Sequence, residues 1–434
     1  MTVTMAEALT TPAGTEIPGP RGRPWVGNVP DYEKNRIRFL QENHKRYGDF
    51  FRFDAASVVV RDPDAIHDCH TRTNTDFVSE EAIISDAPLS NAQAGPWMQA
   101  RRPAWKAMRP KSCLPYGRQL TDAFAATLHQ TAGQFFDPQR VFTDYTSAAL
   151  THICLGEDSP RVVSAVEQRF QAFMVLMNRS WQRPRWLPDP ALRRAQEADR
   201  ELNALLRERL ERTTGPGTDL ASMLMDADLG MKTAAGFLKG TLLAGYGVPA
   251  ISLAWIAHAL ADNPELAERV SAEARAEPDL TEAYGAGRLP LAEALVKELL
   301  RLYPPTWLMG RRVYRNTELR GRHLKPGETV LFSPYLVQRD PRWWGERADT
   351  LDPDRWLADT SGGARHRHAY IPYSGGTRVC IGSALGNTLL VLCTAHLAAH
   401  HHVEPDPSAA VHPHFGTMLT PRGLRLRCRP RHTT

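Results

Sequence analysis

The residues best suited to take part in chemistry surround one cysteine in a glycine-rich loop. Residues 373–382 read YSGGTRVCIG and lie between a Pro/Gly-rich region and an apolar helical pattern. A cysteine just before a helix is stabilised as a thiolate by the backbone N–H groups of the first turn. Gly376 and Gly382 permit a close approach that a Cβ would block. Arg378 provides a cation two residues from Cys380, suited to a nearby carboxylate.

Cys380 has no second Cys or His near it at zinc-ligand spacing. Zinc sites need several protein ligands, whereas haem iron needs only one axial protein ligand. The plain alternative is a buried free cysteine beside a glycine-rich turn. The motifs described next favour the haem interpretation.

Charged residues elsewhere could support this loop. Glu298 and Arg301 are three residues apart on a predicted helix whose leucines indicate burial, so they can pair and would need a third partner. Arg355 is the candidate for that partner.

A second group of residues suits a dianionic cofactor. Trp97 and Arg101 stand one helical turn apart, and Arg312 follows the break at Pro304–Pro305. Together with Arg378 they could neutralise the two propionates of a haem, because guanidinium groups bind carboxylates in a bidentate manner.

Composition and charge exclude several classes of protein. The 434 residues are 42% hydrophobic and 23% charged, as in a soluble globular protein. A net charge of +5 is too small to imply nucleic acid, although an acidic partner protein could dock. Without a long apolar run or a signal-peptide pattern, we expect no membrane anchor and a cytoplasmic location.

Hydrophobic periodicity predicts one large, mainly α-helical domain with a minor β region. Residues 1–20 are polar and contain Pro and Gly, so we expect a flexible segment there and a single domain over 21–434. Apolar residues recur at helical spacing through most of 96–300. Alternating patterns predict strands within 50–60, and the tail after the last helix shows little strand pattern.

Together these motifs resemble the cytochrome P-450 family of haem-thiolate enzymes. The family's F-x-x-G-x-R-x-C-x-G loop matches residues 373–382, with Tyr in place of Phe at its first position. Its E-x-x-R pattern is similar to Glu298 and Arg301, and its W-x-x-x-R pattern to Trp97 and Arg101.

The resemblance covers about residues 20–430 and implies the mainly helical, single-domain P-450 prism of soluble bacterial members. It implies haem b as the cofactor, with Cys380 as the proximal iron ligand. The residues that it places around the cofactor are Trp97, Arg101, Arg312, Tyr373, Arg378 and Gly382. Those that it assigns to structural support are Glu298, Arg301 and Arg355.

The chain departs from the family in the helix that crosses the distal face of the haem. The segment AGYGVPA replaces the usual A-G-x-[D/E]-T-T, so that Gly247 stands for the acid and Val248 for the first threonine. Pro249 stands for the second threonine; we expect it to kink the helix and free the carbonyl of Gly245. Tyr246 carries the remaining hydroxyl in this segment.

Loss of the acid–alcohol pair leaves two reaction classes open. Heterolytic O–O cleavage needs protons, which the acid relays and the alcohol directs through water. The first class is O2-independent reaction at a substrate that is already oxidised at an N–O or O–O bond, including nitrene-type C–N bond formation. The second is O2- and electron-dependent monooxygenation with substrate- or water-assisted protonation, served by ferredoxin and reductase.

The resemblance also implies which residues meet the substrate. These are Ile83, Ile84, Leu89, Thr306, Trp307 and Leu308, together with Val248. Their mostly apolar character implies a hydrophobic small molecule, of the kind processed in specialised metabolism.

Two other interpretations of these residues are less favoured. A non-catalytic P-450-like helper protein is the alternative of a different class, but an intact Cys380 loop argues against it. His400, His401 and His402, with His396 one turn earlier, invite a metal interpretation, but a charged, exposed helix end is favoured.

Overall fold

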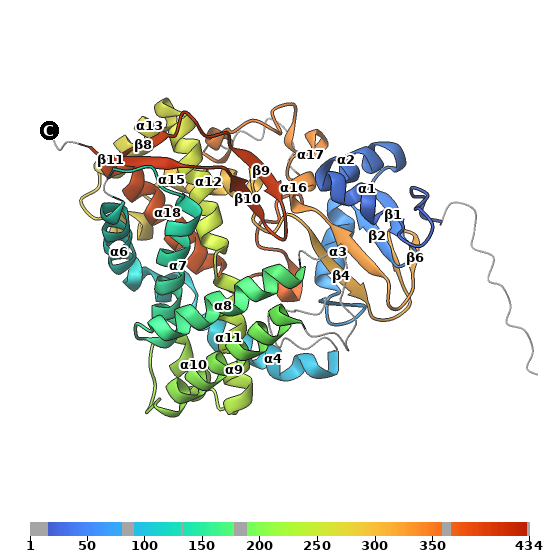
Figure 1. Cartoon of the computed structure of the whole chain (residues 1–434), viewed down its shortest axis with the longest axis horizontal. Helices are drawn as coiled ribbons and strands as arrows, with labels where there is room; N and C mark the ends of the chain where they lie inside the picture. The colour runs from blue at the N-terminus through green and yellow to red at the C-terminus, as the bar shows by residue number, and fades with distance from the viewer. Residues whose placement is uncertain (1–15, 80–90, 132, 178–188, 358–365, 432–434) are drawn as a thin grey trace, which may run out of the picture.

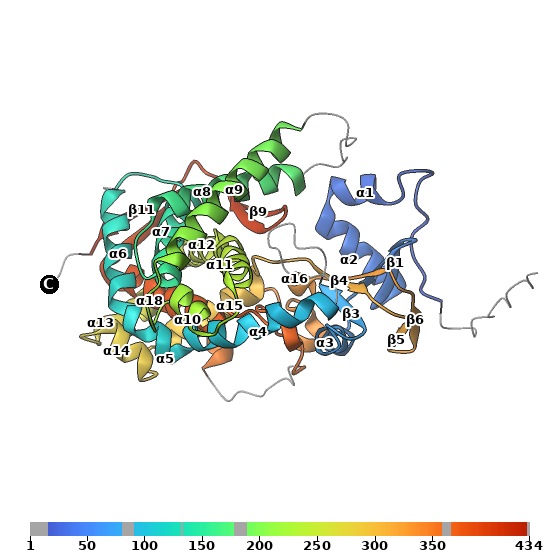
Figure 2. The same ribbon diagram turned by 90° about the horizontal axis from the view of Figure 1, so that it is seen from below.

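Helices make up most of the computed structural model, which describes residues 16–79, 91–131, 133–177, 189–357 and 366–431. Most helices gather in one half of the molecule, and a five-stranded sheet lies at the other end (Figure 1). Seen at right angles, α8 and α9 lie on the opposite side from α4 and α5 (Figure 2). This mainly helical architecture with a minor β region agrees with the periodicity of the sequence.

Many helices begin with proline in the first turn, where its missing N–H is not needed. The first nine helices are α1 (Val29–Lys34), α2 (Arg36–Tyr47), α3 (Pro63–Thr71), α4 (Asn91–Ala107), α5 (Pro110–Cys113), α6 (Gly117–Gln130), α7 (Pro138–Leu155), α8 (Pro160–Met177) and α9 (Pro190–Glu211). The next nine are α10 (Leu220–Asp226), α11 (Met231–Gly245), α12 (Val248–Asp262), α13 (Pro264–Arg275), α14 (Leu280–Gly285), α15 (Pro290–Leu302), α16 (Pro334–Val337), α17 (Pro341–Trp344) and α18 (Ser383–His400).

The strands form one sheet and three two-stranded ribbons among the described residues. The large sheet has the order β1-β2-β7-β4-β3, and only β2 and β7 pair in parallel. The ribbons pair β5 with β6, β8 with β11 and β9 with β10. The strands are β1 (Phe50–Asp54), β2 (Ser57–Val60), β3 (Phe77–Ser79), β4 (Met309–Val313), β5 (Thr317–Leu319), β6 (Arg322–Leu324), β7 (Thr329–Phe332), β8 (His401–Pro405), β9 (His412–Phe415), β10 (Leu419–Arg422) and β11 (Leu426–Pro430).

Helix α9 shows how the sequence forms these elements. The Asp189 carboxylate accepts hydrogen bonds from the backbone N–H groups of Ala191 and Leu192 and so caps the helix. The buried positions recur every three or four residues, which is the stripe expected of a helix on a core. They are Ala191, Ala195, Ala198, Leu202, Leu206 and Leu210.

Helix α12 lies at the centre of the molecule and is buried almost all round. It contacts α7, α15 and α18. Trp255 of α12 stacks on Tyr303, with ring centroids 3.9 Å apart, and its indole N–H donates to the carbonyl of Leu419. The helix that carries the distal residues is therefore held rigidly from behind.

The helix expected to kink at Pro249 is instead interrupted before that residue. Helix α11 ends at Gly245, Tyr246 is extended, and Gly247 has a φ of +73°. Helix α12 then starts afresh at Val248, so Pro249 occupies a first-turn position that tolerates proline. The kink prediction is corrected to a full break, which a left-handed glycine makes possible.

Helices α11 and α12 together form the one described stretch, Met231–Asp262, that is long and apolar enough to cross a membrane. Of its most apolar window, 72% is buried inside the molecule. The apolar composition of this stretch therefore matches its position in the centre of the core.

Two segments differ from the sequence-based expectation. The tail after α18 holds four strands, β8 to β11, which alternation alone does not reveal because histidine and proline interrupt it. Near the N-terminus, Ile17 is buried in the core and Pro18 accepts a hydrogen bond from the N–H of Arg52. Residues 17 and 18 are thus packed, although they fall within the segment expected to be flexible.

The helix break supports a stability prediction with an internal control. In Gly247→Ala, the new Cβ meets only Thr143 Oγ1, at 4.0 Å, so the cost comes from the left-handed backbone and should be about 1 kcal/mol. Gly236 lies inside α11, and an added methyl group would have no atom within 4 Å, so Gly236→Ala should stabilise by about 0.5–1 kcal/mol. Urea unfolding midpoints should shift in opposite directions; a shift in the same direction would contradict this account.

Candidate active site

Cys380 lies in the turn between the 3-10 helix η3 (Gly376–Arg378) and the N-terminus of α18. Its backbone N–H donates to the carbonyl of Tyr373 at 2.9 Å, which closes the loop. The thiol is accessible because it faces a cavity, although protein surrounds it. This desolvation raises the pKa of the thiol, against the opposing effects of the Gly382 N–H bond and the Arg101 charge.

Two of the loop glycines are required by the helix behind them. Gly376 has a φ of +62°, and a Cβ there would overlap the carbonyl oxygen of His70 on α3. A Cβ on Gly375 would lie 2.9 Å from the same residue's ring. Gly382 differs, because its Cβ would meet only Met108 Sδ at 4.0 Å. The protein leaves open space over Gly382 on the cavity side.

Helix α3 and the residues just after it also support the loop through hydrogen bonds. His70 Nε2 lies 3.2 Å from Ser374 Oγ, and Thr377 Oγ1 donates to the carbonyl of Thr73. Burial, with smaller contributions from Arg311 and His67, lowers the pKa of His70 to about 3. His70 is therefore neutral at ordinary pH and acts only as a hydrogen-bond partner.

The structure brings Glu298, Arg301 and Arg355 together in a buried network. Both side chains of the Glu298–Arg301 pair are fully buried, with two parallel hydrogen bonds of 2.7 and 2.8 Å. Arg355 Nε and the Trp356 indole N–H donate to the same carboxylate at 3.0 and 2.9 Å. Burial acts to raise the pKa of Glu298, but these cations and donors outweigh it and lower the pKa.

Gln338 extends this network toward the cysteine loop. Its amide group donates to the carbonyls of Leu300 and Arg301, each at 3.0 Å. Its carbonyl oxygen accepts from the N–H of Ile371, two residues before Tyr373. Gln338 therefore joins α15 to the entry of the loop, a role that the sequence alone did not indicate.

Two of the expected propionate-binding residues lie beside the loop. Arg378 lines the cavity and donates to Asn74 Oδ1 at 3.2 Å, and Arg101 donates to the carbonyl of Val379 at 2.6 Å. Burial, with Arg101 and Arg311 adding repulsion, lowers the pKa of Arg378 to about 10. Trp97 lies further out on α4, its ring 4.6 Å from that of Phe237.

Arg312 requires a correction, because it points away from the cavity. Strand β4 alternates between faces, which leaves Arg312 exposed and buries Arg311. Arg311 donates to Thr73 Oγ1 and to Ser374 Oγ, both at 3.2 Å, and thus lies on the loop side. The sequence offered one sign of this: Val313 is apolar and lies two residues after Arg311, so on a strand both side chains lie on the same, buried face.

The distal residues divide into two groups. Gly245, Val248 and Pro249 line the cavity opposite Cys380. Tyr246 does not, because its ring packs 4.9 Å from that of Phe170 in a separate core cluster, where burial raises its pKa. Gly247 bears no side chain and serves as the left-handed residue that joins the two helices.

Only some of the residues expected to contact the substrate line the cavity. Thr306 lines it, as does Met309. Trp307 instead lies in the core beneath β9 and β10 and donates to the carbonyl of Gly416, and Leu308 packs against the same cluster. Both are therefore corrected to structural positions. The residues expected from the loop before Trp97, namely Ile83, Ile84 and Leu89, lie outside the described residues.

Three hydroxyl groups at the cavity were missed from the sequence. They belong to Thr146 on α7, Thr241 on α11 and Ser252 on α12. Thr241 is committed to the carbonyl of Phe237 at 2.9 Å, whereas Ser252 makes only a 3.4 Å contact with the carbonyl of Val248. Ser252 follows Val248 by one helical turn, and that spacing was the available signal.

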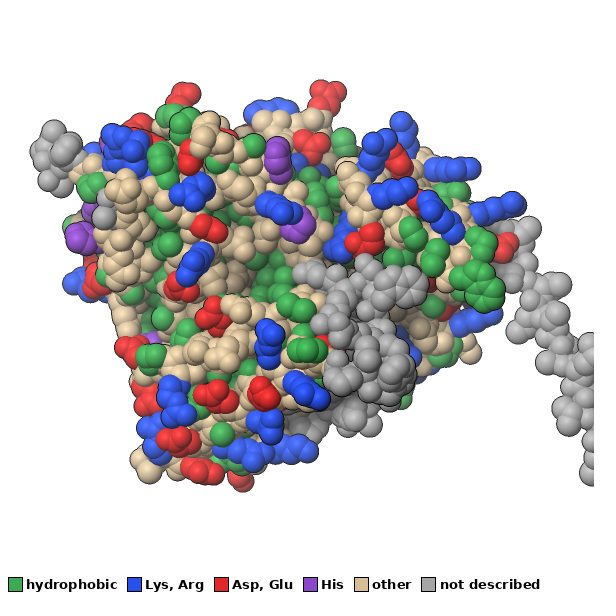
Figure 3. Space-filling view, viewed as in Figure 1, with side chains coloured by type: hydrophobic (Ala, Val, Ile, Leu, Met, Phe, Trp, Pro, Cys, Tyr) green, Lys and Arg blue, Asp and Glu red, His purple; other side chains and the backbone are tan. Residues whose placement is uncertain are grey.

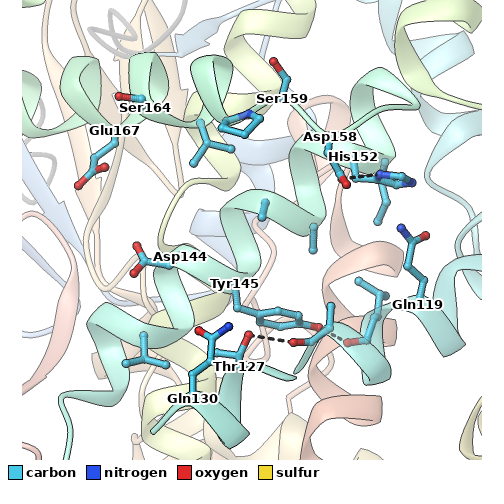
Figure 4. A pocket seen from close by; sticks show the side chains of 18 of the residues that line it. Gln119, Thr127, Gln130, Asp144, Tyr145, His152, Asp158, Ser159, Ser164 and Glu167 are labelled. Atoms are coloured by element: carbon cyan, nitrogen blue, oxygen red, sulfur yellow. Dashed lines mark hydrogen bonds and ion pairs between the residues drawn. The ribbon is translucent and has the colours of Figure 1, made fainter. Parts of the chain in front are cut away.

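A second concavity, of about 940 Å³, is lined by residues of α6, α7 and α8 (Figure 4). Polar side chains rim it, including Asp144, Glu167 and His152, which pairs with Asp158 at 2.8 Å. Its lining residues do not include Cys380 or any arginine. We therefore assign the chemistry to the cavity at Cys380. On the face drawn in Figure 3, acidic and basic side chains are interspersed around a central group of hydrophobic ones.

The cavity at Cys380 fits a haem group by its donor set. One accessible sulfur supplies a single axial ligand, and the space over Gly382 admits a flat ring against the loop. No carboxylate in the described part of the chain forms an ion pair with Arg101 or Arg378. Partly buried guanidinium groups need an anion, and two propionates would provide it.

Comparison with known proteins shows the family directly. The cytochrome P450 family model matches residues 17–427, and the chain belongs to that family. It is therefore a haem-thiolate enzyme of the oxidoreductase type, and this finding confirms the resemblance inferred from the motifs.

The chain is similar to several bacterial members. It is 36% identical over 198 residues to cyclooctatin synthase of Streptomyces melanosporofaciens, an alignment of 44% of this chain and 41% of that protein. It is 30% identical to pentalenene oxygenase of Streptomyces avermitilis, over 71% of this chain and 73% of that protein. The retinoic acid-bound cyanobacterial CYP120A1 structure shares the fold, with a TM-score of 0.82 at 20% identity, covering 96% of this chain and 100% of that one. The P-450 fold class is thereby confirmed.

The two neighbouring arginines of β4 make a matched test of cofactor binding. Arg311→Gln should weaken haem retention, because one charge-assisted contact is worth about 1.5–3 kcal/mol, or about 10- to 100-fold in the haem dissociation rate. Arg312→Gln should leave the rate unchanged, since that side chain is exposed on the outer face. Haem transfer to excess apomyoglobin measures both rates; equal effects of the two substitutions would contradict the assignment of Arg311.

Proposed function

We propose that this chain is a haem b enzyme that converts a hydrophobic small molecule of specialised metabolism, starting from a substrate already oxidised at an N–O or O–O bond. Such a bond carries the oxidising equivalents that O2 and two electrons supply in a monooxygenase. Nitrene-type C–N bond formation from an N–O substrate belongs to this class. The names of the relatives, such as cyclooctat-9-en-7-ol 5-monooxygenase, support a small organic substrate.

The observation that carries the proposal is the composition of the distal wall. Gly247 and Val248 stand where the family has its acid and alcohol, and the left-handed Gly247 cannot orient a side chain toward the cavity. The residues that line the cavity include no carboxylate in the described part of the chain. A reaction that requires delivered protons is thus poorly served, whereas one that starts from a weak N–O or O–O bond is not.

The chain's own residues would act as follows. Bound haem would supply a redox-active, Lewis-acidic iron, and Cys380 would hold it through its sulfur. Arg378, Arg311 and Arg101 would neutralise the propionates, and the Glu298 network would hold the loop from behind. Val248 and Pro249 would exclude water from the distal side.

The carbonyl of Gly245 would orient the substrate. Gly245 lines the cavity as the last residue of α11, and a carbonyl at a helix C-terminus has no partner within its own helix. A substrate N–H or O–H could therefore donate to this oxygen.

One observation favours a second candidate, the O2- and electron-dependent monooxygenase. The hydroxyl of Ser252 lies at the cavity and is only weakly engaged, so it could orient a water in place of the missing threonine. This candidate would need ferredoxin and reductase as electron donors. For either candidate we propose a cytoplasmic location.

Anaerobic turnover separates the two candidates. The purified holoenzyme is incubated without O2 or reductase with a hydrophobic O-acyl hydroxamate, and with cumene hydroperoxide as the O–O probe. We expect product from the N–O probe under these conditions, detected by mass spectrometry, and none with Cys380→Ala. Product that forms only after O2, ferredoxin and reductase are added would refute the first candidate.

A substitution at the position of the missing alcohol provides a complementary test. Val248→Thr is nearly isosteric and restores a hydroxyl, so it should raise the fraction of consumed electrons that reaches product at least twofold in the O2-driven assay. Val248→Ala changes the volume without adding a hydroxyl and is the control. An equal response of both variants would show that the hydroxyl does not decide the reaction. Gly247→Glu is unsuitable, because a φ of +73° would strain the new residue.

A further inference from the structure

A group of metal-ligating side chains lies outside the active site, where α3 meets the segment that leads to the cysteine loop. Asp64 in the first turn of α3, His366 and His368 each offer one ligand atom, and these atoms all lie within 4.8 Å of one another. His368 Nδ1 is 2.8 Å and His366 Nε2 is 3.4 Å from the same oxygen, Asp64 Oδ1. The three side chains are between 17% and 37% exposed, so an ion could enter from solvent.

Neighbouring residues hold these three groups in place. Arg320 binds the other oxygen, Asp64 Oδ2, at 3.1 Å and leaves Oδ1 to the histidines. The His368 ring stacks on that of His67 at 3.7 Å, and the His366 ring lies 5.0 Å from Trp343. Metal ligands in proteins are commonly oriented by such outer contacts, including a hydrogen bond to the non-ligating carboxylate oxygen.

We propose that Asp64, His366 and His368 form a binding site for a divalent transition-metal ion, with zinc as the best match. Two imidazole nitrogens and one carboxylate oxygen are ligands typical of zinc, with water as the fourth. Zinc–ligand bonds of about 2.0–2.2 Å in a tetrahedron place ligand atoms about 3.3 Å apart. The distances of 2.8 and 3.4 Å to Asp64 Oδ1 are already close to that value.

Zinc binding would require each of the two imidazoles to change its tautomer. In the metal-free arrangement the two imidazoles face Asp64 Oδ1 with the nitrogens that would ligate, so each ring proton must move to the opposite nitrogen. For His366 this breaks a 3.3 Å contact with the backbone N–H of His368. The charge of Arg320 is offset by Asp68 at 3.5 Å. The site should therefore bind zinc with moderate, micromolar affinity.

The position of the site gives it a structural consequence. Helix α3 carries Asp64 at its start and His70, which contacts Ser374 and Gly376, near its end. The segment with His366 and His368 continues directly into the loop that holds Cys380. A bound ion would tie these two chain segments together and stabilise the support of the cysteine loop without joining the reaction.

Equilibrium dialysis of the holoenzyme tests the proposal. After EDTA treatment and desalting, the protein is dialysed against 0–200 µM zinc chloride, and bound zinc is measured by atomic spectroscopy. We expect one site in the wild type and at least tenfold weaker binding in His366→Ala/His368→Ala. Asp64→Asn, which keeps the shape of the side chain, should also weaken binding at least tenfold. The reduced-CO spectrum in EDTA checks that each variant is folded.

The matched control is His400→Ala/His402→Ala, at the histidine-rich end of α18. That cluster is the competing explanation for zinc binding. Its partly buried neighbours His396 and His401 have pKa values that desolvation lowers to about 4. The control should retain the site with unchanged affinity. Zinc binding that survives in His366→Ala/His368→Ala, or no binding by the wild type up to 200 µM, would overturn the proposal.

Discussion

The support of the cysteine loop depends on the network of ion pairs and hydrogen bonds around the buried carboxylate of Glu298. A charge with no exposure to water is tolerated only if cations and donors surround it, and here Arg301, Arg355 and Trp356 do so. Arg301 also donates to the carbonyls of Gln338, Ala348 and Thr350. Removing one partner would leave an unpaired buried charge, at a cost of about 3–5 kcal/mol.

The cysteine loop is thus held from two independent sides. On one side, Gln338 joins the Glu298 network to Ile371 at the entry of the loop. On the other, His70 of α3 lies against Gly375 and Gly376 and contacts Ser374, and the carbonyl of Thr73, just after α3, accepts a hydrogen bond from Thr377. A loop held in this way keeps the sulfur of Cys380 in a fixed position. The distal wall, by contrast, offers mainly apolar side chains and a few hydroxyl groups.

Patterns local in the chain were sufficient for much of this description. Each of three features depends on a few residues that are close in the chain. They are the spacing of Glu298 and Arg301 on one helix face, the glycines around Cys380 and the 3.6-residue periodicity of α9. That Gly247 and Val248 carry neither an acid nor an alcohol is equally evident from the sequence, because residue identity alone decides whether a side chain can carry a proton. These are the features that a motif or a period can specify.

Tertiary structure decided what depends on orientation between elements. Arg311 rather than Arg312 faces the loop because the pairing of β4 with β7 sets which face of the strand is buried. The side chain of Trp307 lies in the core, that of Tyr246 lies away from the cavity and that of Ser252 lies at it. By residue type alone, each of the three could lie in the core or at the cavity. The break before Pro249 likewise required a left-handed Gly247 that the packing of α11 and α12 selects. Sequence determines which groups are present and their local geometry, whereas only long-range packing determines which of them share a cavity.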